Sequence, residues 1–199
     1  GLDEAGRGPL AGPVVAAALV INPKHEARNS KQYLNSNSQN SKHVSDFGFR
    51  ISDLRLRDSK QLSQKQREYF YEILTSHKGV RWGIGIVSEK VIDKINILEA
   101  TKLAMEKAVK NLRNKLSYYH CGRNDSKIVD FLILDGNMKL DSAIPQKSIV
   151  KADEKVFSCA AASILAKVTR DRIMLKYSKK YPKYRFDRHK GYGTKLHLK

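Results

Sequence analysis

The hydrophobic positions of the chain follow two different periods, which predict strands and helices in alternation. Short apolar runs bounded by Gly, Pro or Asn are typical of buried strands. Such runs predict strands at residues 2–5, 14–21, 80–87, 131–134 and 148–150. The first two are joined by a Gly- and Pro-rich connection and should form a hairpin-like pair, and the glycines of the third should let a neighbour approach closely.

Three segments instead show the helical period. Ser63 is a candidate N-cap for a helix that runs to about residue 76. The inward-facing residues of this helix should be Tyr69, Phe70, Ile73 and Leu74. Residues 97–116 carry one apolar stripe, and 156–180 form a second long helix whose small residues, 159–163, suit close packing. Alternation of these elements predicts an α/β layered domain with a mixed sheet.

Domain organisation follows from length and local composition. At 199 residues the chain suits one domain spanning 1–199, large enough to bury a hydrophobic core. Residues from about 24 to 56 are rich in Asn, Ser and Lys without any period, which predicts a mobile insertion in a surface loop. A basic C-terminal segment covers about 176–199.

The net charge of the chain limits the classes of partner that it is expected to bind. The 38 Lys and Arg residues outnumber the 20 Asp and Glu, for a net charge of +18, which favours nucleic acid as partner, ahead of an anionic membrane surface. Twelve of these cations, against two acids, lie between residues 167 and 199, interleaved with aromatic residues that can stack on sugars or bases. We expect a nucleic-acid surface there, with His189 near phosphate, although a solvated charged face is the commoner explanation of such a run.

Acidic residues stand where strands end. Asp3 and Glu4 close the first strand, Asp135 follows the fourth, and Asp153 follows the fifth. Functional groups on α/β sheets gather at strand ends, and hard divalent ions such as Mg²⁺ prefer several carboxylate oxygens. Singly, however, Asp135 before Gly136 is typical of a turn, and Asp153 before a helix is typical of an N-cap. The residues alone leave both interpretations open.

Two further features bear on the class of protein. Gly6-Arg7-Gly8 directly follows the acidic pair; it suits either a phosphate grip or a tight turn with a solvated arginine. Cys121 and Cys159 have no partner at metal-ligand spacing, which indicates free thiols and a cytoplasmic protein. No apolar run approaches the length of a membrane span, so we expect no membrane association.

The order of the motifs then resembles that of the type 2 ribonucleases H, the ribonuclease HII family. The resemblance rests on DEAGRGPLAGPVVAAAL from residue 3, DSK at 58–60, LEATKLAMEKAV from 98, LILDGN, AAASILAKVTRDR and YPKYRFDRHKGYGTKLHL. It covers nearly the whole chain outside the insertion. It implies a ribonuclease H-like α/β fold, with a central mixed β-sheet flanked by helices and a basic C-terminal helical segment.

The resemblance also implies an activity and a site. The expected enzyme is an endoribonuclease that cuts the RNA strand of RNA–DNA hybrids and cuts 5′ of ribonucleotides embedded in duplex DNA, in DNA replication and repair. Its metal-binding and catalytic acids fall on Asp3, Glu4, Asp135 and Asp153. The implied mechanism is two-metal-ion catalysis with Mg²⁺ or Mn²⁺, in which an activated water leaves a 3′-hydroxyl and a 5′-phosphate.

The substrate-binding residues are carried over in the same way. Gly6, Arg7 and Gly8 correspond to the loop that senses the ribose 2′-hydroxyl, and Tyr192 to the tyrosine that positions the substrate. Further candidates for phosphate contacts are Lys60, Lys167 and Arg170, although the last two could be structural. We expect Asp171 to pair with a nearby cation, and the protein to act as a monomer.

Some features depart from the family. The 24–56 insertion is longer and more polar than usual, and Ala152 stands where glycine is common, which could shift Asp153. Relatives usually continue beyond the position of residue 199, and we expect such a continuation to add stability or substrate grip rather than chemistry. The alternatives are another nuclease or recombinase of this fold, a non-catalytic basic nucleic-acid-binding protein, and a decayed enzyme.

Overall fold

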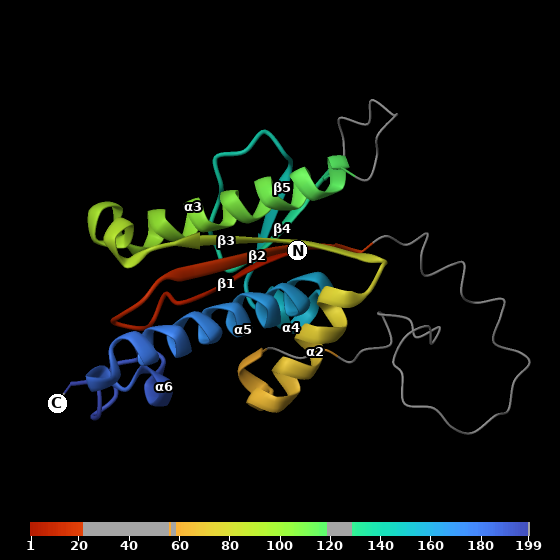
Figure 1. The fold of residues 1–199 in the computed structure, drawn as a ribbon. Coiled ribbons are helices and arrows are strands. Elements are labelled where there is room, and N and C mark those ends of the chain that lie inside the picture. The colour runs from red at the N-terminus through yellow and green to blue at the C-terminus, as the bar shows by residue number, and fades with distance from the viewer. Residues whose placement is uncertain (22–55, 57–58, 119–128, 199) are drawn as a thin grey trace, which may run out of the picture.

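A five-stranded sheet forms the centre of the fold (Figure 1). The structure, a computed structural model, describes residues 1–21, 56, 59–118 and 129–198, so all of the predicted 24–56 insertion except residue 56 lies outside it. The strands are β1 (Leu2–Ala5), β2 (Val14–Ile21), β3 (Val80–Val87), β4 (Leu132–Asp135) and β5 (Gln146–Ile149), in the spatial order β3-β2-β1-β4-β5.

The sheet is mixed, as predicted. β2 pairs antiparallel with both β1 and β3, and the first two strands form the expected hairpin-like pair. β4 pairs parallel with both β1 and β5. The carboxyl ends of β1 and β4 therefore lie at one edge of the sheet, where predicted site residues should meet.

The apolar run of β2 is buried on both faces of the sheet because helices cover each face. Ala16 and Ala18 pack in a core with α3 (Glu89–Tyr118), whereas Ala17 and Leu19 pack in a second core with α5 (Phe157–Lys180). In Figure 1 the sheet lies between α3 on one side and α5 with α2 (Gln64–Ser76) on the other. These layers confirm the predicted α/β architecture.

Close packing of α3 explains the glycines of β3. A Cβ at Gly83 or Gly85 would collide with the backbone of α3, so only glycine lets the helix approach this closely. The predicted helix 97–116 is confirmed, but α3 begins earlier and is kinked. Asn96 has φ 65° and ψ 168°, and its Oδ1 accepts hydrogen bonds from the backbone N–H of Leu98 and Glu99. The side chain thus caps the longer part of α3.

The opposite layer contains one confirmed prediction and one error. Ser63 caps α2 through a capping box with Gln66, as expected. Leu74 is fully buried, and Phe70 and Ile73 pack against the same core. Tyr69, however, is 63% exposed. The prediction that Tyr69 faces inward is wrong: Tyr69 and Leu74 are five residues apart, which places them about 140° apart around the helix, so the face that buries Leu74 leaves Tyr69 exposed.

Short elements complete the chain. They are η3 (Ser59–Gln61), α4 (Ala152–Lys155), η4 (Pro182–Tyr184) and α6 (Phe186–His189). Phe131 and Val150, predicted at strand ends, lie outside β4 and β5 and are exposed. None of the helices in the described residues is both long and apolar enough to cross a bilayer.

Candidate active site

Three carboxylates from three different elements converge at one edge of the sheet. Asp3 lies in β1, Asp135 ends β4, and Asp153 lies in the first turn of α4. One carboxylate oxygen from each lies within 4.8 Å of the others. The sequence-based prediction that these strand ends meet is correct in its geometry.

The chain between β5 and α5 is shaped so that Asp153 reaches this point. Lys151 adopts the left-handed conformation (φ 58°), which turns the chain into α4. The backbone N–H of the next residue, Ala152, donates a 2.6 Å hydrogen bond to Oδ1 of Asp135. Ala152 itself lies in the helix and needs no glycine conformation, so the alanine at this position is compatible with the local fold.

Asp3 is buried close to other carboxylates. Only 5% of the residue is exposed. Desolvation by burial raises the pKa of Asp3 well above its ordinary value, and the nearby carboxylates of Glu4 and Asp135 raise it further. A hydrogen bond from the backbone N–H of Glu4 and another from the Ser163 hydroxyl lower it in part. Such crowding is relieved when a cation neutralises the carboxylates.

Ser163 belongs to a buried hydroxyl pair that the sequence analysis did not identify. Its Oγ lies 2.6 Å from the Oγ of Ser59, and both residues are buried. The pair connects α5 with η3, which contains Ser59 and Lys60 of the DSK motif. The only signal in the sequence was a hydroxyl side chain in a run of alanines, which is equally typical of a tightly packed helix.

Glu4 does not join the three aspartates in the described cluster. Asp3 pairs across the sheet with Ala17 in the α5 core, whereas Glu4 pairs with Ala16 in the α3 core. Consecutive strand residues point to opposite faces, and β1 keeps this alternation. The Oε1 of Glu4 instead lies 3.2 Å from a guanidinium nitrogen of Arg7.

The glycine–arginine loop lies against the C-terminal segment. A Cβ at Gly8 would lie 3.8 Å from the Tyr192 ring, so these two candidate residues are neighbours. The Nζ of Lys167 lies 5.5 Å from the centre of the same ring and 2.9 Å from Oδ1 of Asp171. The structure thus places Lys167 beside Tyr192 and confirms the expected cation partner of Asp171.

The other two residues predicted to contact phosphate are Lys60 and Arg170. The backbone of Lys60 lies in η3, but its side chain is outside the part of the chain that the structure describes. Arg170 is buried and donates hydrogen bonds to three backbone carbonyl groups, so no edge of its guanidinium faces a phosphate. We therefore replace its predicted phosphate contact with a structural role.

His189 also differs from the prediction that it lies near phosphate. It is 6% exposed, its Nε2 hydrogen-bonds to the carbonyl oxygen of Tyr184, and its Nδ1 accepts from the N–H of Gly191. Its ring stacks on His197 with centroids 4.3 Å apart. His189 is therefore part of the packing of the C-terminal segment.

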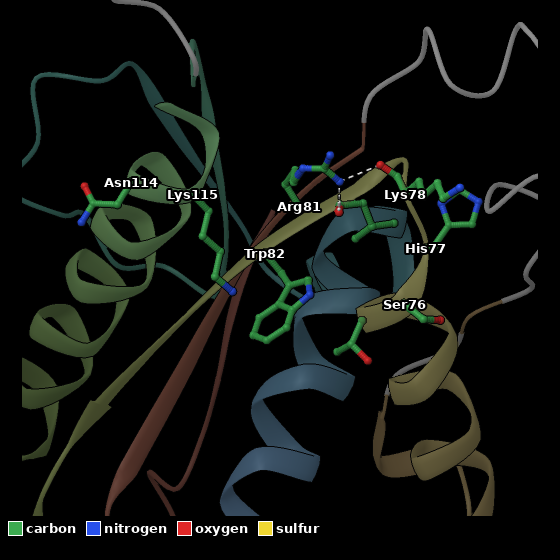
Figure 2. A pocket seen from close by; sticks show the side chains of 9 residues that line it. Ser76, His77, Lys78, Arg81, Trp82, Asn114 and Lys115 are labelled. Atoms are coloured by element: carbon green, nitrogen blue, oxygen red, sulfur yellow. Dashed lines mark hydrogen bonds between the residues drawn. The ribbon is translucent and has the colours of Figure 1, made fainter. Parts of the chain in front are cut away.

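A separate cavity of about 640 Å³ lies between the C-terminal ends of α2 and α3 (Figure 2). Two of its cations already have partners: the Nζ of Lys115 lies 3.6 Å above the Trp82 ring, and Arg81 donates to the carbonyl oxygens of Lys78 and Val80. Of the candidate site residues that the structure describes, none lines this cavity. It is distinct from the aspartate cluster.

Comparison with known proteins connects this geometry to a family. The profile of the ribonuclease HII family matches residues 1–47 and 44–199. Ribonuclease HII of Treponema denticola is 43% identical over 200 residues, covering 100% of this chain and 88% of the relative. Ribonuclease HII of Acetivibrio thermocellus is 46% identical over 199 residues, covering 100% of this chain and 62% of the relative.

Solved structures share the fold. The ribonuclease H2 from Pyrococcus horikoshii OT3 is 27% identical and superposes with a TM-score of 0.64, over 100% of this chain and 82% of the other. Bst-RNase HIII, solved in complex with Mn²⁺, is 19% identical with a TM-score of 0.62, over 91% of this chain and 54% of the other. At that identity the second comparison supports the fold alone.

An α/β sheet that gathers carboxylates at its strand ends, in this fold, defines the ribonuclease H class of metal-dependent nucleases. Within that class, the chain belongs to the ribonuclease HII family. It is accordingly a metal-dependent endonuclease with ribonuclease H activity on RNA–DNA hybrids, and its cofactor is a divalent metal ion of the Mg²⁺ or Mn²⁺ type. The predicted family, fold class, enzyme class and cofactor are confirmed.

Proposed function

We propose that this ribonuclease H also cuts duplex DNA on the 5′ side of embedded ribonucleotides and leaves 3′-hydroxyl and 5′-phosphate ends. The observation that carries this proposal is the position of the glycine–arginine loop. The loop follows β1 directly, so Arg7 lies four residues from the aspartate cluster, and Gly8 lies against the ring of Tyr192. The loop could therefore contact the ribose next to the scissile phosphate at the place where the strand is cut.

The donor set fits divalent metal ions. Asp3, Asp135 and Asp153 offer only carboxylate oxygens, which Mg²⁺ and Mn²⁺ prefer, and their mutual repulsion falls when a cation binds. We propose these three residues as ligands of a two-ion site, with Glu4 as a fourth ligand because its carboxylate, although it lies outside the three-aspartate cluster, is near enough to raise the pKa of Asp3. When bound, such ions activate water and stabilise the charge that develops on the phosphodiester.

The chain's own residues then have separate tasks. The Ala152 N–H holds the carboxylate of Asp135, and the Ser163 hydroxyl and Glu4 N–H hold that of Asp3, so the ligand atoms are oriented before a metal ion binds. Arg7 and the loop backbone contact the ribose 2′-hydroxyl, which distinguishes RNA from DNA. Tyr192, 41% exposed, packs against the sugar, and Lys167 beside it contacts a backbone phosphate.

The basic C-terminal segment supports binding of the duplex. It combines many cations with exposed rings, including Tyr181 at 43% and Tyr184 at 59% exposure. Cations that neutralise phosphates release counterions, so we expect affinity to fall steeply as salt rises.

The test uses labelled 20-bp duplexes with or without one ribonucleotide. We expect Mg²⁺- or Mn²⁺-dependent cleavage at the 5′ side of the ribonucleotide, and no cleavage of the all-DNA control. A chain that cut long RNA–DNA hybrids but ignored the single ribonucleotide would contradict the proposal. Cleavage of all-DNA duplex would indicate a different nuclease, and binding without any cleavage would indicate a non-catalytic nucleic-acid-binding protein.

A further inference from the structure

Arg170 is buried where two loops meet on α5. Only 1% of the residue is exposed, and its three guanidinium nitrogens each donate a hydrogen bond of 2.9 Å to a backbone carbonyl oxygen. Nε donates to Pro13 and Nη2 to Ala11, both in the connection between β1 and β2. Nη1 donates to Lys190, in the turn that precedes Tyr192.

The two loops also bond directly to each other. The backbone N–H groups of Leu10 and Ala11 both donate to the carbonyl oxygen of Gly191, at 2.9 and 3.3 Å. Gly191 has φ +87°, and a Cβ at that position would collide with the carbonyl oxygen of Ala11. Glycine is therefore required both by the backbone conformation and by the close approach of the first loop.

The fork geometry of arginine suits this junction and no smaller cation does. A planar guanidinium presents several N–H groups in fixed directions, so one side chain can satisfy three carbonyl groups from two segments. Lysine has a single nitrogen and cannot span these three oxygens from one position. Burial lowers the pKa of Arg170, and the three backbone carbonyl groups supply the acceptors that solvent would otherwise provide.

We propose that Arg170 is a positioning residue that fixes the Arg7 loop relative to Tyr192. The segment 190–191 that it holds is followed at once by Tyr192, and the 11–13 segment that it holds ends the loop that begins with Gly6-Arg7-Gly8. This inference rests on the proposed recognition of the ribose by Arg7 and Tyr192. Arg170 contacts neither substrate nor metal and acts through the two loops.

The expected functional consequence of the Arg170 junction is that Arg7 and Tyr192 are held precisely relative to each other. A shift of about 1 Å in a positioned group can lower a rate on the order of 10²-fold, because the reactive arrangement becomes rarer. Loss of the junction should therefore lower kcat on the ribonucleotide-containing duplex much more than it raises KM, since the basic segment still binds the duplex. The aspartate cluster lies on β1, β4 and α4, outside the junction, so metal binding should persist.

The central variant is Arg170→Lys, which keeps the charge and removes the fork. Gly191→Ala is the second variant, because it forces the same two loops apart and leaves the guanidinium intact. The matched control is Arg172→Lys: Arg172 lies on the same helix and pairs with Glu68 and Glu72 on α2, away from both loops. Circular dichroism and Mn²⁺ titration of each purified protein establish that the fold and the metal site are retained.

Two readouts then decide the proposal. We expect Arg170→Lys and Gly191→Ala to lower kcat on the ribonucleotide-containing duplex by about 10- to 100-fold, with KM changed by less than about threefold. Both should speed amide hydrogen exchange in the peptides that cover residues 8–13 and 189–194, whereas Arg172→Lys should change neither readout.

Wild-type kcat and wild-type exchange in a folded Arg170→Lys protein would overturn the inference. Slower cleavage with unchanged exchange would also overturn it, because Arg170 would then act on the substrate directly. If the wild-type protein does not cut at a single ribonucleotide, the proposed function fails, and the exchange measurement still decides whether Arg170 holds the two loops.

Discussion

The guanidinium of Arg7 lies 3.2 Å from the carboxylate of Glu4, which connects the loop proposed to read the ribose with a residue proposed to bind metal. Arg7 is partly exposed, while the side chain of Glu4 is mostly covered. The ion pair therefore holds the guanidinium of Arg7 beside Glu4, the residue that follows Asp3 in β1. Because Arg7 supplies a positive charge rather than a ligand oxygen, its loss should affect selection of the substrate more than metal binding.

Arg7→Ala tests this separation. We expect kcat/KM for a single-ribonucleotide duplex to fall at least about tenfold, because a charge-assisted contact to substrate contributes on the order of 1.5–3 kcal/mol. The Mn²⁺ dissociation constant, measured by calorimetry, should stay within about threefold of the wild type. Arg113→Ala, an exposed site on α3, is the control. Equal losses of metal affinity and cleavage would show that Arg7 supports the metal site instead.

The burial of Asp3 predicts a penalty in the metal-free protein. Its raised pKa means that the folded state holds the Asp3 proton more tightly than the unfolded chain does. Stability from this group is therefore fully present at low pH and is lost as pH rises from the ordinary carboxyl range through the raised value. At neutral pH and above, the metal-free protein carries this penalty and a divalent ion relieves it.

Asp3→Asn should remove both the loss of stability in the metal-free protein and the stabilisation by a divalent ion. We expect the metal-free Tm to rise by about 2–4 °C near pH 8, equivalent to about 1 kcal/mol for a domain of this size. The increase in Tm on adding Mn²⁺, which should grow with pH in the wild type, should be lost. Asp141→Asn, at an exposed position, should change neither quantity. A lower metal-free Tm for Asp3→Asn would show that the charge of Asp3 stabilises the fold.

The buried hydroxyl pair predicts energetic coupling between α5 and η3. Ser163→Ala leaves the buried Ser59 hydroxyl without this partner and should destabilise the protein by about 1–3 kcal/mol, whereas Ser59→Ala should cost less because Ser163 keeps its hydrogen bond to Asp3. The double variant should be less unstable than the sum of the two by about 1 kcal/mol, as measured by urea unfolding. Additive losses would mean that the two hydroxyls do not depend on each other.

The kink in α3 predicts losses of different size for two substitutions at one position. Asn96→Ala removes the side-chain cap and places alanine at a positive φ, so we expect a loss of about 1–2 kcal/mol in the free energy of unfolding. Asn96→Gly also removes the cap but tolerates the backbone conformation, and it should change stability by only a few tenths of a kcal/mol. Denaturant unfolding of both variants checks this order, and equal losses would contradict it.

Local patterns predicted the elements, and the general rule that functional groups gather at strand ends predicted the meeting of the aspartates. Apolar runs located the strands, and the rule that functional groups gather at strand ends brought Asp3, Asp135 and Asp153 together before any coordinates. Ser63 was identifiable as an N-cap because capping involves residues three positions apart.

The remaining features depend on contacts between distant segments. Arg170 resembled a phosphate ligand in the sequence, since nothing local shows that Ala11, Pro13 and Lys190 surround it. His189 was placed near phosphate because its partners could not be read from a basic, aromatic tail. The long-range arrangement of side chains decides whether such a cation faces solvent or backbone.

The proposed cleavage reaction depends most on the aspartate cluster. Substitutions at Asp153 and at its neighbour Glu154 should differ most in their effect on it. Asp153 is buried in the cluster, whereas Glu154 is exposed and pairs with Lys151. The decisive measurement is the single-turnover cleavage rate of the ribonucleotide-containing duplex at saturating Mg²⁺. We expect Asp153→Asn to lower that rate by about 10³-fold or more and Glu154→Gln to leave it within about twofold of the wild type. A folded Asp153→Asn protein that cleaves as fast as the wild type would contradict the account.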